Sequence, residues 1–229
     1  IQFSGVPVSN RHWKLSLEMC NSNGAGIVLQ ENRLKIKPWS IAMKSKLEVP
    51  KDASMASFAM LAVSCLEIPV KIIGWPEREE CIGHEILFDI SESLGINWNN
   101  SNLKKLSISR SIEVDITNCN DIITPLSLML ALASGGKITG ALHTTFKESN
   151  RLKSTKQLFE SFGMKCDLLE DGILIPGNQL PKTTEKLVHT FGDHRVFMSA
   201  YLLACRVGAT IDGNGLHKIA DEKFIERIS

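Results

Sequence analysis

The sequence lacks the motifs with which many enzymes hold phosphates, dinucleotides or an activated nucleophile. It contains no G-x-x-x-x-G-K-[ST] loop, no G-x-G-x-x-G run and no nucleophile elbow. Its six histidines show no metal-ligand spacing, and none of its six cysteines forms a C-x-x-C pair. Phosphate chemistry in such a protein would therefore have to depend on side chains that hold the phosphate directly.

The sequence also lacks a strong net charge and long apolar runs. Its 26 Lys and Arg residues nearly balance 25 Asp and Glu residues, which leaves a net charge of +1. This balance gives no general attraction to nucleic acid or to an anionic membrane, so we expect neither as a partner. No apolar stretch reaches the length of a membrane span. Any anion must therefore bind through a local cluster of cations.

The cysteines and the first residues bear on where the chain works. Several cysteines lie in apolar runs such as 62–66, a pattern typical of reduced core thiols and hence of the cytoplasm. Residues 1–5 have neither an initiator Met nor a signal-peptide layout. We therefore expect a cytoplasmic protein whose sequence is entered partway through.

A repeat of about seventy residues organises the chain. Three stretches each contain an Asp, an apolar helix rich in small residues and a short strand that ends in Gly: residues 52–74, 121–140 and 193–213. A second element, an amphipathic helix followed by Gly and a hairpin, recurs around Gly24, Gly95 and Gly163. The repeating unit is thus helix, strand, helix, strand, strand, which predicts an α/β (α+β) fold.

The first helix of each unit should be buried, and the second should lie nearer solvent. Residues 125–133 are apolar all round, whereas residues 153–161 carry Glu and Lys on one face. Asp52, Asp121 and Asp193 stand near the starts of the apolar helices and suit helix caps. If the units are related by near-symmetry, the three helix N-termini point the same way and form an anion site.

Two short segments could carry chemistry. In residues 146–151, Lys147 and Arg151 are four residues apart and would share a helix face beside Glu148, so they could bind a phosphate and move a proton. The alternative is an ordinary solvated face. In the second segment, Arg195 directly precedes an apolar helix, where an arginine needs an anionic partner; the alternative is an exposed residue next to a capped helix start.

The sequence resembles the EPSP synthase family of enolpyruvyl transferases. The resemblance runs over nearly the whole chain and is carried by four segments: K-E-S-N-R at 147–151, D-H-R-V-F-M at 193–198, D-A-S-M-A-S-F at 52–58 and V-S-N-R-H at 8–12. It implies a fold of two lobes, each built of βαβαββ-like units around buried parallel helices, with the active site between them. Residues 1–46 would be the tail of the N-terminal lobe, and residues 47–229 the C-terminal lobe. The boundary falls near residue 46, after a linker-like run from Lys37.

The resemblance also implies a reaction and a set of residues. The reaction is transfer of enolpyruvate from phosphoenolpyruvate to the 5-hydroxyl of shikimate 3-phosphate, with release of phosphate and without a metal or organic cofactor. Asp121 matches the carboxylate that takes the hydroxyl proton, and Glu148 matches the group that handles the proton at C3. The residues matched to phosphoenolpyruvate are Arg151, Arg195 and Lys218, and those matched to shikimate 3-phosphate are Ser9, Asp121, His143 and Lys147. The partner would be the N-terminal half of the same enzyme.

The sequence departs from the family pattern at several positions. His143 stands where Asn is usual, and Asn150 replaces an Asp, so Arg151 would have one ionic neighbour fewer. Two alternatives remain: an enolpyruvyl transferase that acts on UDP-N-acetylglucosamine, and a non-catalytic anion-binding scaffold. The scaffold predicts that Asp121, Glu148, Arg151, Arg195 and Lys218 do not converge, whereas the enzyme predicts that they line one face.

Overall fold

The computed structural model describes residues 1–5, 8–42 and 49–228. The helices in these ranges are α1 (Asn10–Ser22), α2 (Ala56–Leu66), α3 (Ile86–Ile90), α4 (Ile123–Leu132), α5 (Arg151–Ser161), α6 (His194–Val207) and α7 (Phe224–Ile228). The strands are β1 (Val28–Gln30), β2 (Arg33–Lys35), β3 (Val70–Lys71), β4 (Ile96–Asn99), β5 (Asn102–Lys105), β6 (Ile112–Asp115), β7 (Gly135–Thr139), β8 (Asp167–Leu169) and β9 (Gly172–Pro176). The mixed α/β class is confirmed.

The strands form small, mostly antiparallel sheets. β1 pairs with β2; β3, β5 and β4 form the second sheet in that order; and β6, β7, β9 and β8 form the third, in which only the β6–β7 pair is parallel. The three predicted hairpins, β1–β2, β4–β5 and β8–β9, are all present. At the tip of the last hairpin a Cβ on Gly172 would lie 1.9 Å from the Ile138 carbonyl oxygen, so only glycine allows β9 to approach β7 there.

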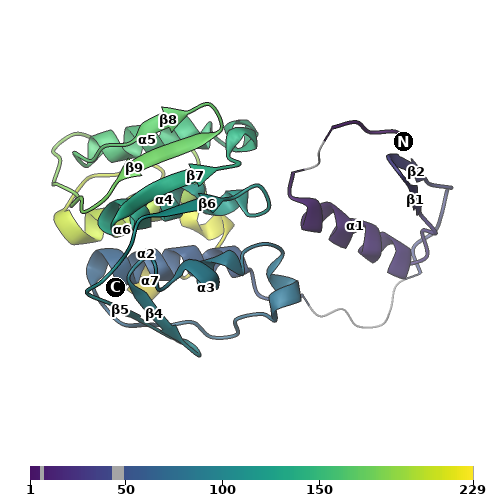
Figure 1. Cartoon of the computed structure of the whole chain (residues 1–229), viewed down its shortest axis with the longest axis horizontal. Helices are drawn as coiled ribbons and strands as arrows, with labels where there is room; N and C mark the ends of the chain where they lie inside the picture. Colours follow the sequence, from purple (N-terminus) through teal and green to yellow (C-terminus); the bar gives the residue numbers. More distant parts are fainter. Residues whose placement is uncertain (6–7, 43–48, 229) are drawn as a thin grey trace.

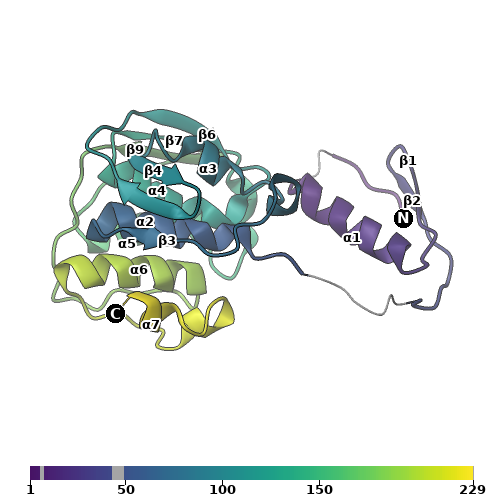
Figure 2. The same ribbon diagram turned by 90° about the horizontal axis from the view of Figure 1, so that it is seen from below.

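The three helices predicted to be buried, α2, α4 and α6, form the centre of the larger group of elements (Figure 2). In α4 every residue from Ile123 to Ala131 is buried, as its continuous apolar sequence requires. The starts of α2 and α6 lie close together, because Arg195 at the start of α6 donates from Nη2 to Ser54 Oγ (3.0 Å), just before α2. Their ends meet too, because Arg206 near the end of α6 donates to the Cys65 carbonyl oxygen in α2. Helices α2 and α6 are therefore parallel, as predicted.

Helix α5 corrects one prediction. It covers one side of the four-stranded sheet in Figure 1 and exposes Lys153 and Glu160, as predicted from its charged face. It begins only at Arg151, however, because Asn150 caps it by accepting a hydrogen bond from the Lys153 amide. Lys147 lies before the cap in extended backbone. The expectation that Lys147 and Arg151 share a helix face was therefore wrong.

The third repeat is less regular than predicted. The strand expected at residues 209–213 consists of one parallel bridge between Val188 and Ile211. The carboxylate of Asp212 binds residues 189 and 190 in place of further ladder hydrogen bonds. The chain then continues into the 3-10 helix η5 (Leu216–Ile219) and α7.

Helix α1 and the β1–β2 hairpin lie to one side of the other elements (Figure 1). No residue of α1 is buried. Its start is held by polar contacts: Ser9 N donates to Thr117 O (3.0 Å), Asn10 N donates to the Asn118 side chain (3.1 Å), and Arg11 forms an ion pair with Glu85. The predicted domain boundary near residue 46 lies outside the described residues.

The cysteines are all free thiols, and four of them are buried. Burial raises the pKa of Cys65 to about 11 and that of Cys119 to about 12. None of the described helices is both long and apolar enough to cross a membrane.

Candidate functional site

Arg151 is the centre of a charged cluster at the starts of the buried helices. Its side chain is only 1% exposed, and each of its nitrogens faces a different carboxylate. Nε donates to Asp193 Oδ2 (2.8 Å), Nη1 to Asp121 Oδ1 (2.8 Å) and Nη2 to Glu148 Oε2 (2.5 Å). Although Asn150 replaces the usual Asp, Arg151 thus has three ionic partners. A buried guanidinium requires such compensation.

Asp193 both caps α6 and neutralises Arg151. Its Oδ1 accepts the Arg195 amide hydrogen (2.9 Å), and its Oδ2 accepts hydrogen bonds from Arg151 and from Ser149 (3.0 Å). Burial disfavours its charge, but the hydrogen bond and charge of Arg151 outweigh burial, so its pKa lies below the usual value. The prediction that Asp193 is a cap is confirmed; its bond to Arg151 was not foreseen.

Asp121 is placed among three cations. Arg151 lies at 2.8 Å, Lys147 Nζ at 3.7 Å and Arg195 Nε at 3.8 Å from the same oxygen, Oδ1. Burial opposes its ionisation, but the charges of Arg195, Lys147 and Arg151 lower the pKa further than burial raises it. Asp121 lies in the 3-10 helix η3 (Asn120–Ile122) and makes no side-chain cap. Unlike Asp52, which accepts the Ser54 amide hydrogen, it is free to act in the cluster.

Two nitrogens of the Arg195 side chain make no hydrogen bond in the described structure. Its side chain is 9% exposed, and Nη2 donates to Ser54. Its Nε and Nη1 are buried and have no hydrogen-bond partner among the described residues. Buried, unpartnered guanidinium donors are costly, so this position is suited to an anionic ligand.

Three other predicted residues occupy different surroundings. Ser9 Oγ accepts a hydrogen bond from Asn120 (2.7 Å), next to Asp121. His143 Nε2 is buried without a partner in the described structure, and burial, then Lys147, lower the pKa of the ring. Lys218 is exposed on η5, and no ion pair joins it to another described residue. Asp121, Glu148, Arg151 and Arg195 therefore converge as predicted, whereas no side-chain hydrogen bond or ion pair joins Lys218 to them in the described structure.

Sequence reasoning missed His194. Its ring is buried, and Nδ1 lies 3.9 Å from Glu148 Oε1. Burial, reinforced by the charge of Arg195, lowers its pKa, which favours the neutral imidazole. The only signal in the sequence was its place between Asp193 and Arg195, which indicates proximity to the helix start but not to Glu148.

We expect Asp193→Asn to destabilise the protein by about 3–5 kcal/mol at neutral pH, because it leaves Arg151 buried with one carboxylate fewer. Because the pKa of Asp193 is lowered on folding, its stabilisation is present above the ordinary Asp value, about 3.9, and is lost as the pH falls through the folded value. The free energy of unfolding, measured with urea, should therefore fall less steeply between pH 7 and pH 3 for Asp193→Asn than for the unchanged protein. Asp167→Asn, at an exposed strand position, is the control; equal pH slopes for all three proteins would contradict the expectation.

Comparison with solved structures places the fold among the enolpyruvyl transferases. The EPSP synthase of Acinetobacter baumannii superposes with a TM-score of 0.65 at 20% identity, over 93% of this chain and 53% of that one. The enolpyruvyl transferase NikO of Streptomyces tendae superposes with a TM-score of 0.66 at 16% identity, over 94% of this chain and 51% of that one. At these identities the likeness concerns the fold alone.

The family follows from the sequence comparison. Residues 1–228 match the model of the EPSP synthase (3-phosphoshikimate 1-carboxyvinyltransferase) family, and the chain belongs to that family. The 3-phosphoshikimate 1-carboxyvinyltransferases of Caldicellulosiruptor bescii and Caldicellulosiruptor saccharolyticus are 32% and 30% identical, each over 88% of this chain. These alignments cover 49% and 50% of the relatives, so the chain spans about half their length.

Proposed function

We propose that this chain is the C-terminal half of an enzyme that transfers enolpyruvate from phosphoenolpyruvate to the 5-hydroxyl of shikimate 3-phosphate. The complete enzyme, as the term is used below, is this chain together with the N-terminal half that its relatives carry. The observation that carries the proposal is Arg195, whose buried Nε and Nη1 make no hydrogen bond to the described residues, although Nε lies 3.8 Å from Asp121 Oδ1. A phosphate or carboxylate group of phosphoenolpyruvate has the charge and oxygens that these donors need.

The neighbouring carboxylates suit the two proton transfers of the reaction. Asp121 is ionised among its cations, which also make it a weak base. Anionic substrates bound to those cations would raise its pKa and allow it to accept the proton of the attacking hydroxyl. Glu148 is half exposed, which suits a group that exchanges a proton with substrate carbon C3. Arg151 holds both carboxylates at once, so it fixes the distance between the base and the acid.

The remaining roles extend to the rest of the predicted site. We assign Ser9, His143 and Lys147 to shikimate 3-phosphate, because Ser9 and Lys147 lie near Asp121 and His143 offers an unpartnered nitrogen. Lys218 would reach phosphoenolpyruvate only after its exposed side chain turns toward the cleft. Residues 1–46 would complete the N-terminal lobe, and the enzyme would work in the cytoplasm.

The test is phosphate release by the complete enzyme supplied with phosphoenolpyruvate and shikimate 3-phosphate. Arg195→Gln should lower kcat/KM for phosphoenolpyruvate by about 10²–10³-fold, as expected when a fixed donor to a developing charge is removed. Arg227→Gln, which removes an exposed arginine paired with Asp221, is the matched control and should change little.

The outcomes separate the alternatives. Turnover only with UDP-N-acetylglucosamine as acceptor would indicate the related transferase. Binding of phosphoenolpyruvate without release of phosphate from either acceptor would indicate an anion-binding scaffold. Unchanged kcat/KM in Arg195→Gln would remove Arg195 from the site.

A further inference from the structure

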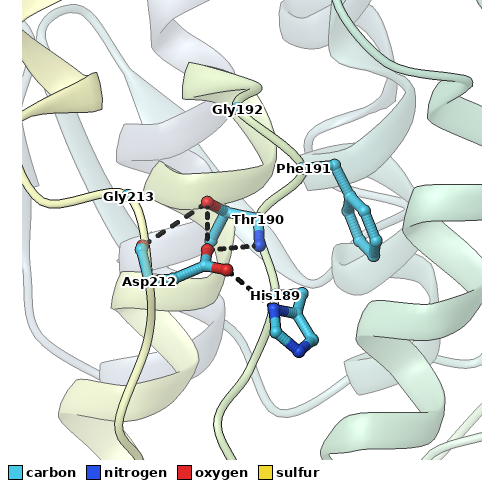
Figure 3. A pocket seen from close by; sticks show the side chains of 6 residues that line it. All are labelled: His189, Thr190, Phe191, Gly192, Asp212 and Gly213. Atoms are coloured by element: carbon cyan, nitrogen blue, oxygen red, sulfur yellow. Dashed lines mark hydrogen bonds and ion pairs between the residues drawn. The ribbon is translucent and has the colours of Figure 1, made fainter.

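A short turn directly before α6 places the start of this helix next to the charged cluster. It runs from His189 through Thr190, Phe191 and Gly192 to the cap residue Asp193, and it lines an open pocket together with Asp212 and Gly213 (Figure 3). Asp193 ends this turn, and Arg195 is the second residue after it. The conformation of the turn therefore decides where the Arg151 partner and the free Arg195 donors are placed.

The turn has an unfavourable backbone. Phe191 has a φ of 58° and Gly192 a φ of 70°, so two consecutive residues adopt left-handed conformations. Glycine tolerates this region, but a bulky aromatic residue rarely does. A bulky residue held there is strained, and the conformation persists only when its surroundings determine it. The side chain of Phe191 is 40% exposed and points away from the Asp212 carboxylate in Figure 3; its ring lies 6.4 Å from the ring of His189, the residue that Asp212 also binds.

The carboxylate of Asp212 holds the residues just before the turn. Its Oδ1 accepts two hydrogen bonds from Thr190, one from the amide and one from the hydroxyl, both at 2.7 Å. Its Oδ2 accepts a hydrogen bond from His189 Nδ1 at 2.8 Å (Figure 3). Thr190 is fully buried, and its carbonyl oxygen in turn accepts the Asp193 amide hydrogen (3.0 Å). A continuous chain of hydrogen bonds thus leads from Asp212 through Thr190 to Asp193.

A regular sheet does not take over this task. In the second repeat β6 and β7 pair over four residues, whereas the corresponding contact in the third repeat is the single bridge between Val188 and Ile211. This bridge consists of two backbone hydrogen bonds, from Val188 N to Thr210 O and from Asp212 N to Val188 O. Beyond residue 188, the Asp212 side chain makes the contacts that a longer ladder would otherwise make.

We propose that Asp212 is a positioning residue for the anion site: by holding Thr190, it fixes the strained turn that places Asp193 against Arg151 and aims the free donors of Arg195. This inference rests on the proposed function of Arg195. Asp212 touches none of the residues assigned to the substrates. It acts through the turn, and its loss should affect the site more than the stability of the lobe.

The test compares two substitutions at Asp212 in the complete enzyme. Asp212→Ala removes all three side-chain hydrogen bonds. We expect kcat/KM for phosphoenolpyruvate to fall by about 10–100-fold, because a displacement of about 1 Å can cost 100-fold in rate. Asp212→Asn keeps an oxygen for Thr190 and can donate to His189 in its other tautomer, so it should stay within about threefold of the unchanged enzyme. Asp221→Ala is the control, because Asp221 caps the neighbouring α7 region with similar bonds that do not lead to the site.

A second measurement does not depend on catalysis. Hydrogen exchange of the amides of residues 190–195 should accelerate at least tenfold in Asp212→Ala and remain unchanged in Asp212→Asn and Asp221→Ala. Unchanged exchange in Asp212→Ala, or equal losses of kcat/KM in the Ala and Asn variants, would overturn the proposal. Failure of the complete enzyme to release phosphate from phosphoenolpyruvate and shikimate 3-phosphate would instead contradict the proposed function, and the exchange result would still decide whether Asp212 holds the turn.

Discussion

Replacing Glu148 by glutamine is expected to lower turnover of the complete enzyme by about 10²–10⁴-fold, the usual effect of losing a proton-transfer group. Glutamine has the same shape and still offers an oxygen to Arg151 Nη2, which lies 2.5 Å from Glu148 Oε2. It cannot exchange a proton with the substrate. The loss should therefore fall on kcat, while the affinity for shikimate 3-phosphate changes little.

The measurement is steady-state phosphate release, with binding of shikimate 3-phosphate followed separately by calorimetry. Glu160→Gln is a control, because Glu160 is an exposed glutamate on α5, the helix that begins three residues after Glu148. A near-normal kcat for Glu148→Gln would remove Glu148 from the mechanism. An equal loss in Glu160→Gln would attribute the effect to the helix instead.

The second large effect concerns this chain by itself: we expect it to fold in its larger lobe but to show no enzymatic turnover. Folding is expected because residues 49–228 contain α2, α4 and α6 together with the sheets that cover them. Catalysis is not expected, because the N-terminal half would supply the opposite wall of the cleft. Without that wall the substrates would stay in water, where an ion pair contributes only about 1 kcal/mol or less.

Circular dichroism and a cooperative thermal transition would establish folding of the isolated chain. Phosphate release would then be followed with both substrates, first for the chain alone and then after addition of the N-terminal half of a relative. Turnover at an ordinary rate before that addition would contradict the two-lobe proposal. Recovery of activity on mixing would support it.

Much of the fold could be predicted because its signals are local and repeated. The apolar runs at α2, α4 and α6 determined which helices are buried, and the glycines before each hairpin marked where strands return. The convergence of Asp121, Glu148 and Arg151 was predicted from the repeat and the family motifs together.

The unpredicted features depend on contacts between distant residues. The hydrogen bond from Arg151 to Asp193 joins positions 42 residues apart, whereas capping is visible in the local sequence. The start of α5 was misjudged because charge spacing suggested a helix through Lys147 and outweighed the capping preference of Asn150. The strand expected in the third repeat is a single bridge, next to which the Asp212 side chain forms hydrogen bonds; the hydrophobic pattern of the sequence does not indicate such bonds.

The shared guanidinium of Arg151 also limits how this family member can evolve. Replacing Asp121, Glu148 or Asp193 by a residue without an acceptor oxygen leaves a donor of the buried guanidinium without its partner, so such changes are expected at several of these positions together or not at all. Lys218 is exposed and forms no ion pair within the described residues, so it can be replaced by a single mutation without a compensating change elsewhere. In a lineage that no longer needed the chemistry, Lys218 would be lost early, while Arg151 and its carboxylates would persist as long as the lobe had to fold.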